Sequence, residues 1–184
     1  MGDFHRSLKG KFIIAGSALR DPNFYQSIVL LIEHQREGAF GLIVNRIANL
    51  TLGQVVPEIE NETSEQVVFE GGPVRQDILF ILHKHEQYQE EDSELIPGVF
   101  VGRSKEVLLK LAEKSMGFRV FRGYAGWGPG QLEDEIRANS WLSLDAVPEE
   151  IFTAEPELAW RDSLLTLGGI CNYYSRMVRD PALN

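Results

Sequence analysis

The sequence predicts a single α+β domain, in which an antiparallel-rich mixed β-sheet is packed by a few helices. A length of 184 residues is enough for one domain and too short for two ordinary ones. Hydrophobic residues make up 43% and charged residues 24%, which is typical of a globular protein. Expected strands outnumber helices, and several are joined by turns too short for a crossover helix. No repeat or linker divides residues 1–184, so we expect one domain, with a loose tail from about residue 173.

The first half of the chain is expected to be mainly β-structure. Runs of apolar, often β-branched residues predict strands at Lys11–Ala15, Ile28–Glu33, Ala39–Asn45 and Val67–Glu70. The polar segment His34–Gly38 predicts a β-hairpin between the second and third of these. Leu52–Val56 predicts a short helical turn that Pro57 stops. Glu58–Gln66 contains four Glu and is expected to be a mobile surface loop.

The second half alternates strands with helices. Strands are predicted at Ile78–His83, Gly98–Val101, Phe118–Arg122 and Trp141–Leu144. Ser104 as N-cap and Gly117 as a stop delimit the first helix. Pro129 lies near the start of the second helix, and Pro156 opens the last. The acidic segment Lys84–Glu94 is expected to be a loop.

The charge balance argues against direct nucleic-acid binding. Eighteen Lys and Arg against 27 Asp and Glu give a formal net charge of −9, a field that repels a phosphate backbone. The basic residues between positions 103 and 122 are interleaved with core positions. We therefore interpret them as solvated edges of a helix and a strand.

Cysteine content and hydropathy indicate where in the cell the protein is expected and which cysteine chemistry it lacks. Cys171 is the only cysteine, which excludes an intramolecular disulfide and a cysteine-based zinc cluster; we expect a small buried residue. The apolar run Phe12–Ala15 is too short for a secretory signal. The longest apolar run, Ile28–Ile32, is far below the roughly 20 residues of a membrane span. The sequence therefore predicts a cytoplasmic protein outside the membrane.

The glycine-rich segment Gly123–Gln131 is the most informative stretch of the sequence for locating a possible site. It lies between a predicted strand and a predicted helix, where backbone N–H groups and the helix dipole can hold an anion. However, Glu133, Asp134 and Glu135 crowd the first helical turns and oppose a phosphate. Apart from a phosphate site, two other interpretations of this segment remain. The segment is either a structural corner in which Trp127 packs, or a small-ligand site.

Histidines form a second candidate cluster. His83 and His85 lie at i, i+2, on one face of a strand, and His34 follows Glu33 at the end of another strand. A metal site is geometrically possible if these strands pair. The alternative is that the histidines are solvated residues at a strand end. We expect no metal and no cofactor.

Polar residues beside glycine turns suggest where a pocket could form. Asn45 and Arg46 follow one predicted strand, and Glu70, Gly71 and Gly72 end another. Arg46 could equally pair with Glu70. The candidate ligand-binding residues are Glu33, His34, Asn45, Arg46, Gly71, Gly72, Tyr124, Trp127 and Gln131.

Several segments together resemble the bacterial YqgE/AlgH family. They are Asp21–Phe24, Ser27–Leu31, Glu33-His34, Gly38–Arg46, Gly71–Val74, Phe80–His83, Gly123–Trp127, Gly130–Glu133, Glu135-Ile136, Asn139 and Trp141-Leu142. They follow the family's order and extend over most of the chain. Two positions depart from it, since the family often has proline where this chain has Gly16–Ala18 and Ile47. The resemblance implies an α+β fold and supplies no agreed catalytic residues. One branch carries a name that suggests transcriptional control of polysaccharide production.

Three functions are compatible with these observations. The first is a small-ligand-binding or regulatory protein without catalysis, because the chain lacks a G-x-x-x-x-G-K-[ST] loop, a G-x-S-x-G elbow and H-E-x-x-H. The alternative is an enzyme with a site at the strand ends near Asn45, Arg46 and Tyr124. A DNA-binding transcriptional regulator is the third, and the net charge opposes it.

Overall fold

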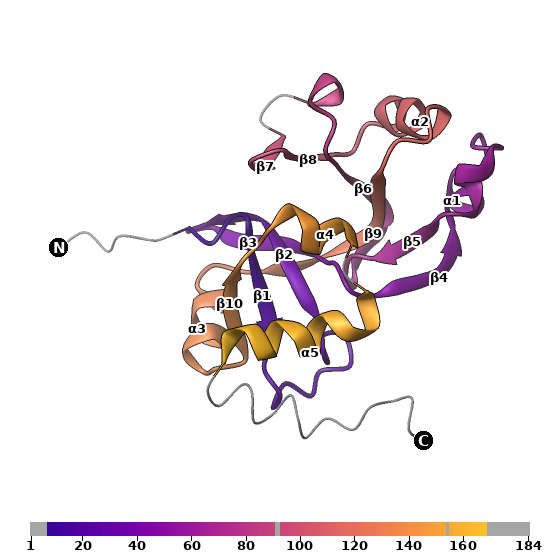
Figure 1. Ribbon diagram of the computed structural model, residues 1–184. Coiled ribbons are helices and arrows are strands. Elements are labelled where there is room, and N and C mark those ends of the chain that lie inside the picture. The colour runs from indigo at the N-terminus through magenta and orange to yellow at the C-terminus, as the bar shows by residue number, and fades with distance from the viewer. Residues whose placement is uncertain (1–6, 91–92, 154, 169–184) are drawn as a thin grey trace, which may run out of the picture.

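The computed structural model describes residues 7–90, 93–153 and 155–168 (Figure 1). The predicted loose tail and Cys171 lie outside these ranges. The strands are β1 (Lys11–Ala15), β2 (Ile28–Gln35), β3 (Gly38–Ile43), β4 (Ile47–Thr51), β5 (Val67–Glu70), β6 (Val74–His83), β7 (Glu94–Ile96), β8 (Val99–Gly102), β9 (Phe118–Trp127) and β10 (Trp141–Asp145). The helices are α1 (Leu52–Val55), α2 (Lys105–Glu113), α3 (Gln131–Arg137), α4 (Pro148–Thr153) and α5 (Pro156–Leu167), with 3₁₀ turns η1 (Glu62–Glu65) and η2 (Glu86–Tyr88).

All ten strands belong to one sheet, which confirms the predicted α+β class. Its main path runs β10-β1-β2-β3-β9-β6-β8-β7, and β5 joins β4 to β9. Every pairing is antiparallel except that of β5 with β9, where Phe69 lies opposite Phe121. The sheet is therefore mixed and antiparallel-rich, as the short connections predict.

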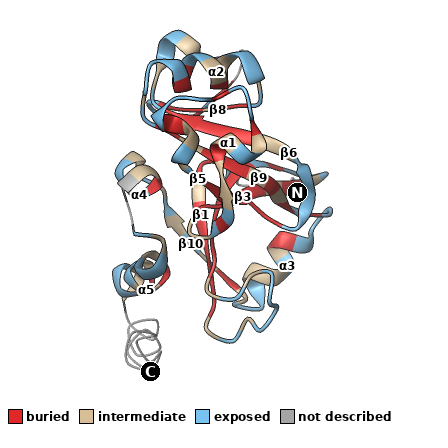
Figure 2. Ribbon diagram, turned by 90° about the vertical axis from the view of Figure 1, so that its right-hand side faces the viewer, coloured by how far each residue is buried: buried red, intermediate tan, exposed pale blue. Residues whose placement is uncertain are grey.

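The curled sheet has two buried faces. We call the inner face the one that carries Phe12, Leu30, Leu42 and Phe121, which α4 and α5 cover with residues such as Trp160. The outer face is covered by α3 over one end of the sheet and by α1 and α2 over the other. Figure 2 shows α4 and α5 on one side of the buried strands and α3 on the opposite side. No helix in the described ranges is long and apolar enough to cross a membrane.

The predicted helix starts hold in the structure, whereas the predicted stop Gly117 lies beyond the end of α2. The Ser104 hydroxyl accepts a hydrogen bond from the N–H of Val107 and caps α2. Pro156 occupies the first turn of α5, and Gly168 ends that helix with a φ of 67°. Local chemistry was therefore sufficient to place both helices.

Several segments differ from their predicted form. β9 does not end at Arg122 but continues through Trp127, because Ala125 and Gly126 pair with β3 like any other strand residues. The chain turns only at Gly128–Gly130. The expected loop Glu58–Gln66 contains η1 and is tied down, since the Thr63 hydroxyl donates to the Ala112 carbonyl at 3.1 Å. The short elements β4, β7 and α4 were not predicted.

Candidate functional site

Part of the inner face remains uncovered beyond α4 and α5 and forms a hollow of about 670 Å³. We call this hollow the aromatic trough. It crosses the strands from the β2–β3 hairpin, over β9 and β6, to the loop after β8. Its principal lining residues are Glu33, Gln35, Phe40, Ile78, Phe80, Arg103, Tyr124 and Gly126.

A β-bulge and a glycine create the trough from otherwise regular strands. The register of β2 against β3 shifts between Leu31 and Glu33, so Ile32 stays in the core while Glu33 lies opposite Phe40. Gly126 also lies opposite Phe40 and has no side chain to fill the space. A Cβ there would lie 3.3 Å from Cε2 of Tyr124. The inner face thus changes at this edge from packed core to an open hollow.

Three aromatic rings form the floor. The ring centroids of Phe40, Phe80 and Tyr124 lie 5.7 to 6.1 Å apart in edge-on or tilted pairs. Phe80 is buried, whereas Phe40 and Tyr124 are half-buried and available to a ligand. The floor is therefore apolar, preorganised and partly exposed.

Opposite charges lie at the two ends of the trough. Glu33 and Glu37 are exposed on the hairpin. The Arg103 guanidinium lies 5.4 Å above the Phe80 ring at the other end. Within the described chain no carboxylate forms an ion pair with Arg103, whereas Arg75 on the rim pairs with Asp77 at 2.9 Å. The arrangement suits an apolar molecule that carries a polar group.

Gly71 and Gly72 shape this region without lining the trough. Gly72 has a φ of 153°, and a Cβ on it would lie 2.2 Å from the carbonyl carbon of Tyr124. A Cβ on Gly71 would lie 2.3 Å from the Gly123 oxygen. Both glycines are therefore required for the close approach of this segment to β9, which positions Tyr124.

Trp127 and Gln131 belong to a hydrogen-bonded structural cluster. The Trp127 indole N–H donates to Oε2 of Glu135 at 2.9 Å, and the Trp141 indole donates to the same oxygen at 2.7 Å. The Gln131 amide donates to Oε1 of Glu135 and accepts from the Gly128 N–H. Trp127 is only 6% exposed and stacks on Phe24. Its packing matches the structural interpretation of the glycine-rich segment.

His34 lies on the outer face, away from Glu33. Its Nδ1 accepts a hydrogen bond from the Leu8 N–H at 2.9 Å, so Nε2 carries the proton and donates to Glu133 at 3.1 Å. His34 is 5% exposed and ties β2 to α3. The acidic residues Glu133 and Glu135 therefore have partners within the fold, which a helix-dipole argument from sequence does not reveal.

The predicted histidine pair His83 and His85 has structural contacts as well. His83 is 1% exposed and stacks on Phe100, and burial lowers its pKa. Its Nδ1 accepts from the His85 N–H, so it is not the solvated residue that one sequence interpretation expected. Among the described residues, no group of three or more His, Cys, Asp or Glu is arranged to hold a metal ion.

Asn45 and Arg46 stabilise the turn before β2. The Asn45 amide accepts from the Ile28 N–H and donates to the Gln26 carbonyl, at 2.8 and 2.9 Å. The Arg46 guanidinium donates to the carbonyls of Asn23 and Tyr25. The Glu70 carboxylate accepts from Gln76 instead. Asn45 and Tyr124 were predicted from the sequence to share one candidate site, but they line different hollows.

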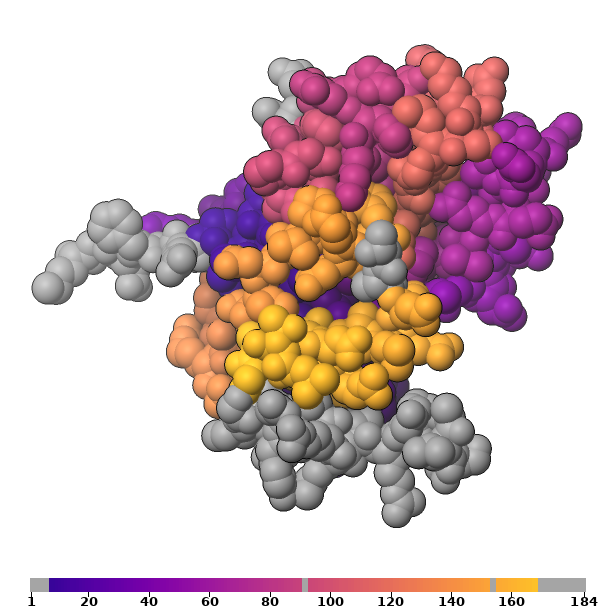
Figure 3. Space-filling model, viewed as in Figure 1, coloured from indigo at the N-terminus to yellow at the C-terminus, as the bar shows by residue number. Residues whose placement is uncertain are grey.

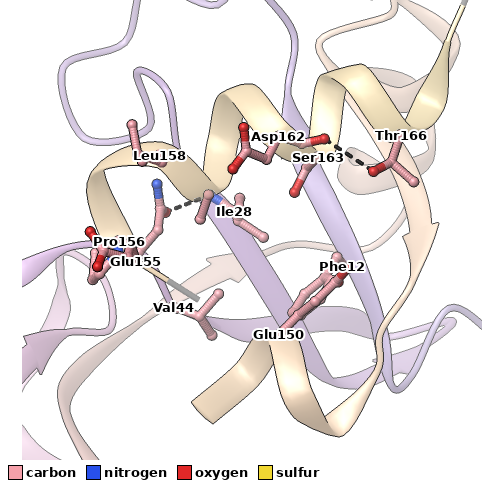
Figure 4. Close-up of a pocket in the computed structure, with 12 residues that line it drawn as sticks. Phe12, Ile28, Val44, Glu150, Glu155, Pro156, Leu158, Asp162, Ser163 and Thr166 are labelled. Atoms are coloured by element: carbon pink, nitrogen blue, oxygen red, sulfur yellow. Dashed lines mark hydrogen bonds between the residues drawn. The ribbon is translucent and has the colours of Figure 1, made fainter. Parts of the chain in front are cut away.

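Asn45 borders a second hollow of about 300 Å³ between α4 and α5 (Figure 3). Phe12, Ile28 and Val44 form its apolar floor, and Glu150 approaches from α4 (Figure 4). Partial burial raises the pKa of Glu150. This hollow is smaller than the trough, and the charged residues that line it are all acidic.

Comparison with known proteins matches this chain to a family. The sequence profile described as AlgH-like matches residues 12–172. The chain belongs to the AlgH-like family. This AlgH-like chain is 38% identical to a UPF0301 protein of Cytophaga hutchinsonii over 96% of this chain and 98% of the relative. It is 34% identical to a UPF0301 protein of Vibrio cholerae over 88% and 92%.

Solved structures of relatives share the fold. The solution structure of the AlgH protein from Pseudomonas aeruginosa matches with a TM-score of 0.76 and 29% identity over 98% of both chains. A crystal structure from Corynebacterium diphtheriae matches with a TM-score of 0.75 at 22% identity, which shows a common fold. The family resemblance read from the sequence motifs is thus confirmed.

The trough of the AlgH-like chain contains only part of the predicted residue set. Glu33, Tyr124 and Trp127 line it, while His34, Asn45, Arg46 and Gln131 hold other parts of the fold. Sequence reasoning missed the aromatic pair Phe40 and Phe80 and the cation Arg103. One available signal was the change from apolar to polar residues at Glu33 and Gln35, which marks where a strand face leaves the core.

Proposed function

We propose that this protein binds a small, largely apolar ligand in the aromatic trough, without catalysis. The supporting observation is the exposed part of the ring cluster Phe40, Phe80 and Tyr124 at the bottom of a hollow of about 670 Å³. Small-molecule sites commonly occupy about 300 to 1,000 Å³ and combine apolar walls with a few polar groups. Arg103 and Glu33 supply such groups at the two ends.

The enzymatic alternative receives less support from the geometry. It requires reactive side chains at the strand ends, but the polar atoms of Asn45 and Arg46 bind backbone groups of the preceding turn. A regulatory role follows from ligand binding if occupancy of the trough changes a partner surface. The proposal keeps the cytoplasmic location expected from the sequence, which cell fractionation tests.

A thermal-shift screen with a metabolite panel tests the proposal directly. A ligand at 100 times its dissociation constant adds about 2.7 kcal/mol to the free energy of unfolding. For a chain of this length that stabilisation raises the melting temperature by roughly 5 to 10 °C.

Two glycine variants locate the site of any ligand found. Gly126→Val projects a side chain into the trough from a backbone conformation that valine adopts readily, and it should abolish binding. Gly117→Val is the matched control, because a Cβ at Gly117 meets nothing within 4 Å and Gly117 does not line the trough. Equal binding by both variants would contradict the trough as the site.

A further inference from the structure

We propose a second binding site that takes small organic anions, in which a phosphate or carboxylate is carried on an apolar or aromatic body. The site is a pocket of about 410 Å³ on the inner face beside α4. It shares no lining residue with the aromatic trough. Its main lining side chains are Gln66, Phe69, Lys84, His85, Arg119 and Phe152.

Two cations line this pocket, Arg119 on β9 and Lys84 directly after the end of β6. Arg119 of β9 lies opposite Leu82 of β6, and Lys84 follows two residues later. Lys84 and Arg119 are therefore near neighbours at this end of the sheet, with Cα atoms about 7 to 8 Å apart. Like charges held in one pocket repel, and a bound anion between them offsets that repulsion. None of the described lining residues is acidic.

The pocket is basic although the whole chain has a formal net charge of −9. In the described part of the chain, the exposed carboxylate of Glu149 reaches it from outside, at 3.9 Å from the Lys84 ammonium and with 75% of its side chain exposed. Such a long, exposed contact contributes little attraction and is easily displaced. The local field therefore favours an anionic ligand over the cations that the rest of the surface attracts.

The cationic groups are held before any ligand arrives. The Arg119 guanidinium lies 4.6 Å above the Phe69 ring and donates to the Phe152 carbonyl at 3.0 Å. The Lys84 ammonium lies 5.1 Å from the Phe152 ring centroid. The His85 ring is also fixed, because Nε2 donates to the Gly117 carbonyl at 3.0 Å. Little side-chain entropy remains to be lost when an anion binds.

Aromatic walls define the second part of the ligand. Phe152 is half-buried and supplies exposed aromatic surface in the pocket, whereas Phe69 lies buried beneath the Arg119 guanidinium. An inorganic anion contacts only the charges, whereas an aromatic anion also buries its ring. The geometry therefore points to an organic anion rather than to free phosphate.

Arg119 also has a structural role, since its bond to the Phe152 carbonyl anchors α4. A substitution of Arg119 would remove both the anion contact and the contact with α4, so a loss of binding could not be assigned to either. Lys84 is the better test residue, because its side chain is 39% exposed and its partner Glu149 is solvated. Lys110→Gln is the matched control, a lysine with a Glu106 partner on the exposed surface of α2.

The experiment is an amide NMR titration of the full chain with phenyl phosphate and, separately, benzoate. We expect saturable shifts centred on Lys84, His85 and Arg119 with at least one of the two. Lys84→Gln should weaken that binding about tenfold, the factor expected for one charge-assisted contact. Lys110→Gln should leave the dissociation constant unchanged, and both variants should melt like the parent protein.

Four outcomes would overturn the proposal. The first is an absence of saturable shifts in this pocket with either anion. The second is equal affinity of the parent and Lys84→Gln proteins. The third is binding of a control compound as tight as that of phenyl phosphate. Tight binding of benzylamine would show that the negative charge has no role, and tight binding of inorganic phosphate would show that the aromatic ring has none. Shifts at Phe40 and Tyr124 alone would place the anion in the trough and reject this site.

Discussion

Replacing Glu135 by alanine tests how the glycine-rich corner is stabilised. One carboxylate oxygen of Glu135 accepts hydrogen bonds from the indole N–H groups of both Trp127 and Trp141. The two indoles are 6% and 1% exposed, so they have little access to water as a substitute partner. The other oxygen accepts from the Gln131 amide, which is exposed.

The expected loss follows from these contacts. A buried donor left without an acceptor costs about 1 to 3 kcal/mol, and Glu135→Ala leaves two such indole groups. Gln131 can turn to solvent and contributes little. The free energy of unfolding should therefore fall by about 2 to 6 kcal/mol, a large part of the 5 to 15 kcal/mol of a typical domain.

Urea denaturation followed by far-UV circular dichroism measures this loss. Glu135→Gln keeps an acceptor oxygen and should lose much less. Asp134→Ala is the control on the same helix, since its exposed pair with Arg137 is worth roughly 0 to 1 kcal/mol. If Glu135→Ala and Asp134→Ala lose equally little, the carboxylate does not hold the two indoles.

Three further predictions concern single residues. Because burial lowers the pKa of His83, the unfolded chain binds its proton more tightly, so stability is complete above about pH 6.5 and falls below it. His83→Phe should flatten this fall in pH-dependent denaturation, and an unchanged profile would refute the assignment. Asn45→Ala should lower the unfolding free energy by about 1 to 3 kcal/mol through the lost turn contacts, with ligand affinity of the trough unchanged. Gly72→Ala should prevent folding, whereas Gly126→Ala should give soluble, folded protein, as expression and circular dichroism will show.

The sequence was most informative where local chemistry acts alone. The β-branched run at Ile28 predicted β2 because alternating apolar side chains can fill both sheet faces. Ser104 and Pro156 marked helix starts through hydrogen bonding and fixed backbone geometry. The family motifs identified the family, and the family profile confirmed that identification.

Glycine misled the sequence reading at β9. A cluster of glycines predicts a turn, but Gly126 pairs with Phe40 within the sheet and only Gly130 has a positive φ at the corner itself. Backbone pairing of β9 with β3, which is far away in sequence, keeps this segment extended. The same pairing places Gly126 at the wall of the aromatic trough, where it has no side chain to fill the space.

What the sequence determined by itself was the α+β class, most strands and helices, and the family to which the chain belongs. These depend on periodicity, capping and turn chemistry over a few residues. Only the tertiary structure decided which polar residues face a hollow and which bind the fold. His34 and Glu33 are adjacent in sequence, yet a one-residue bulge and the alternation of β2 send His34 to Glu133 and Glu33 to the trough. Strand register over long distances sets that division, and no local pattern encodes it.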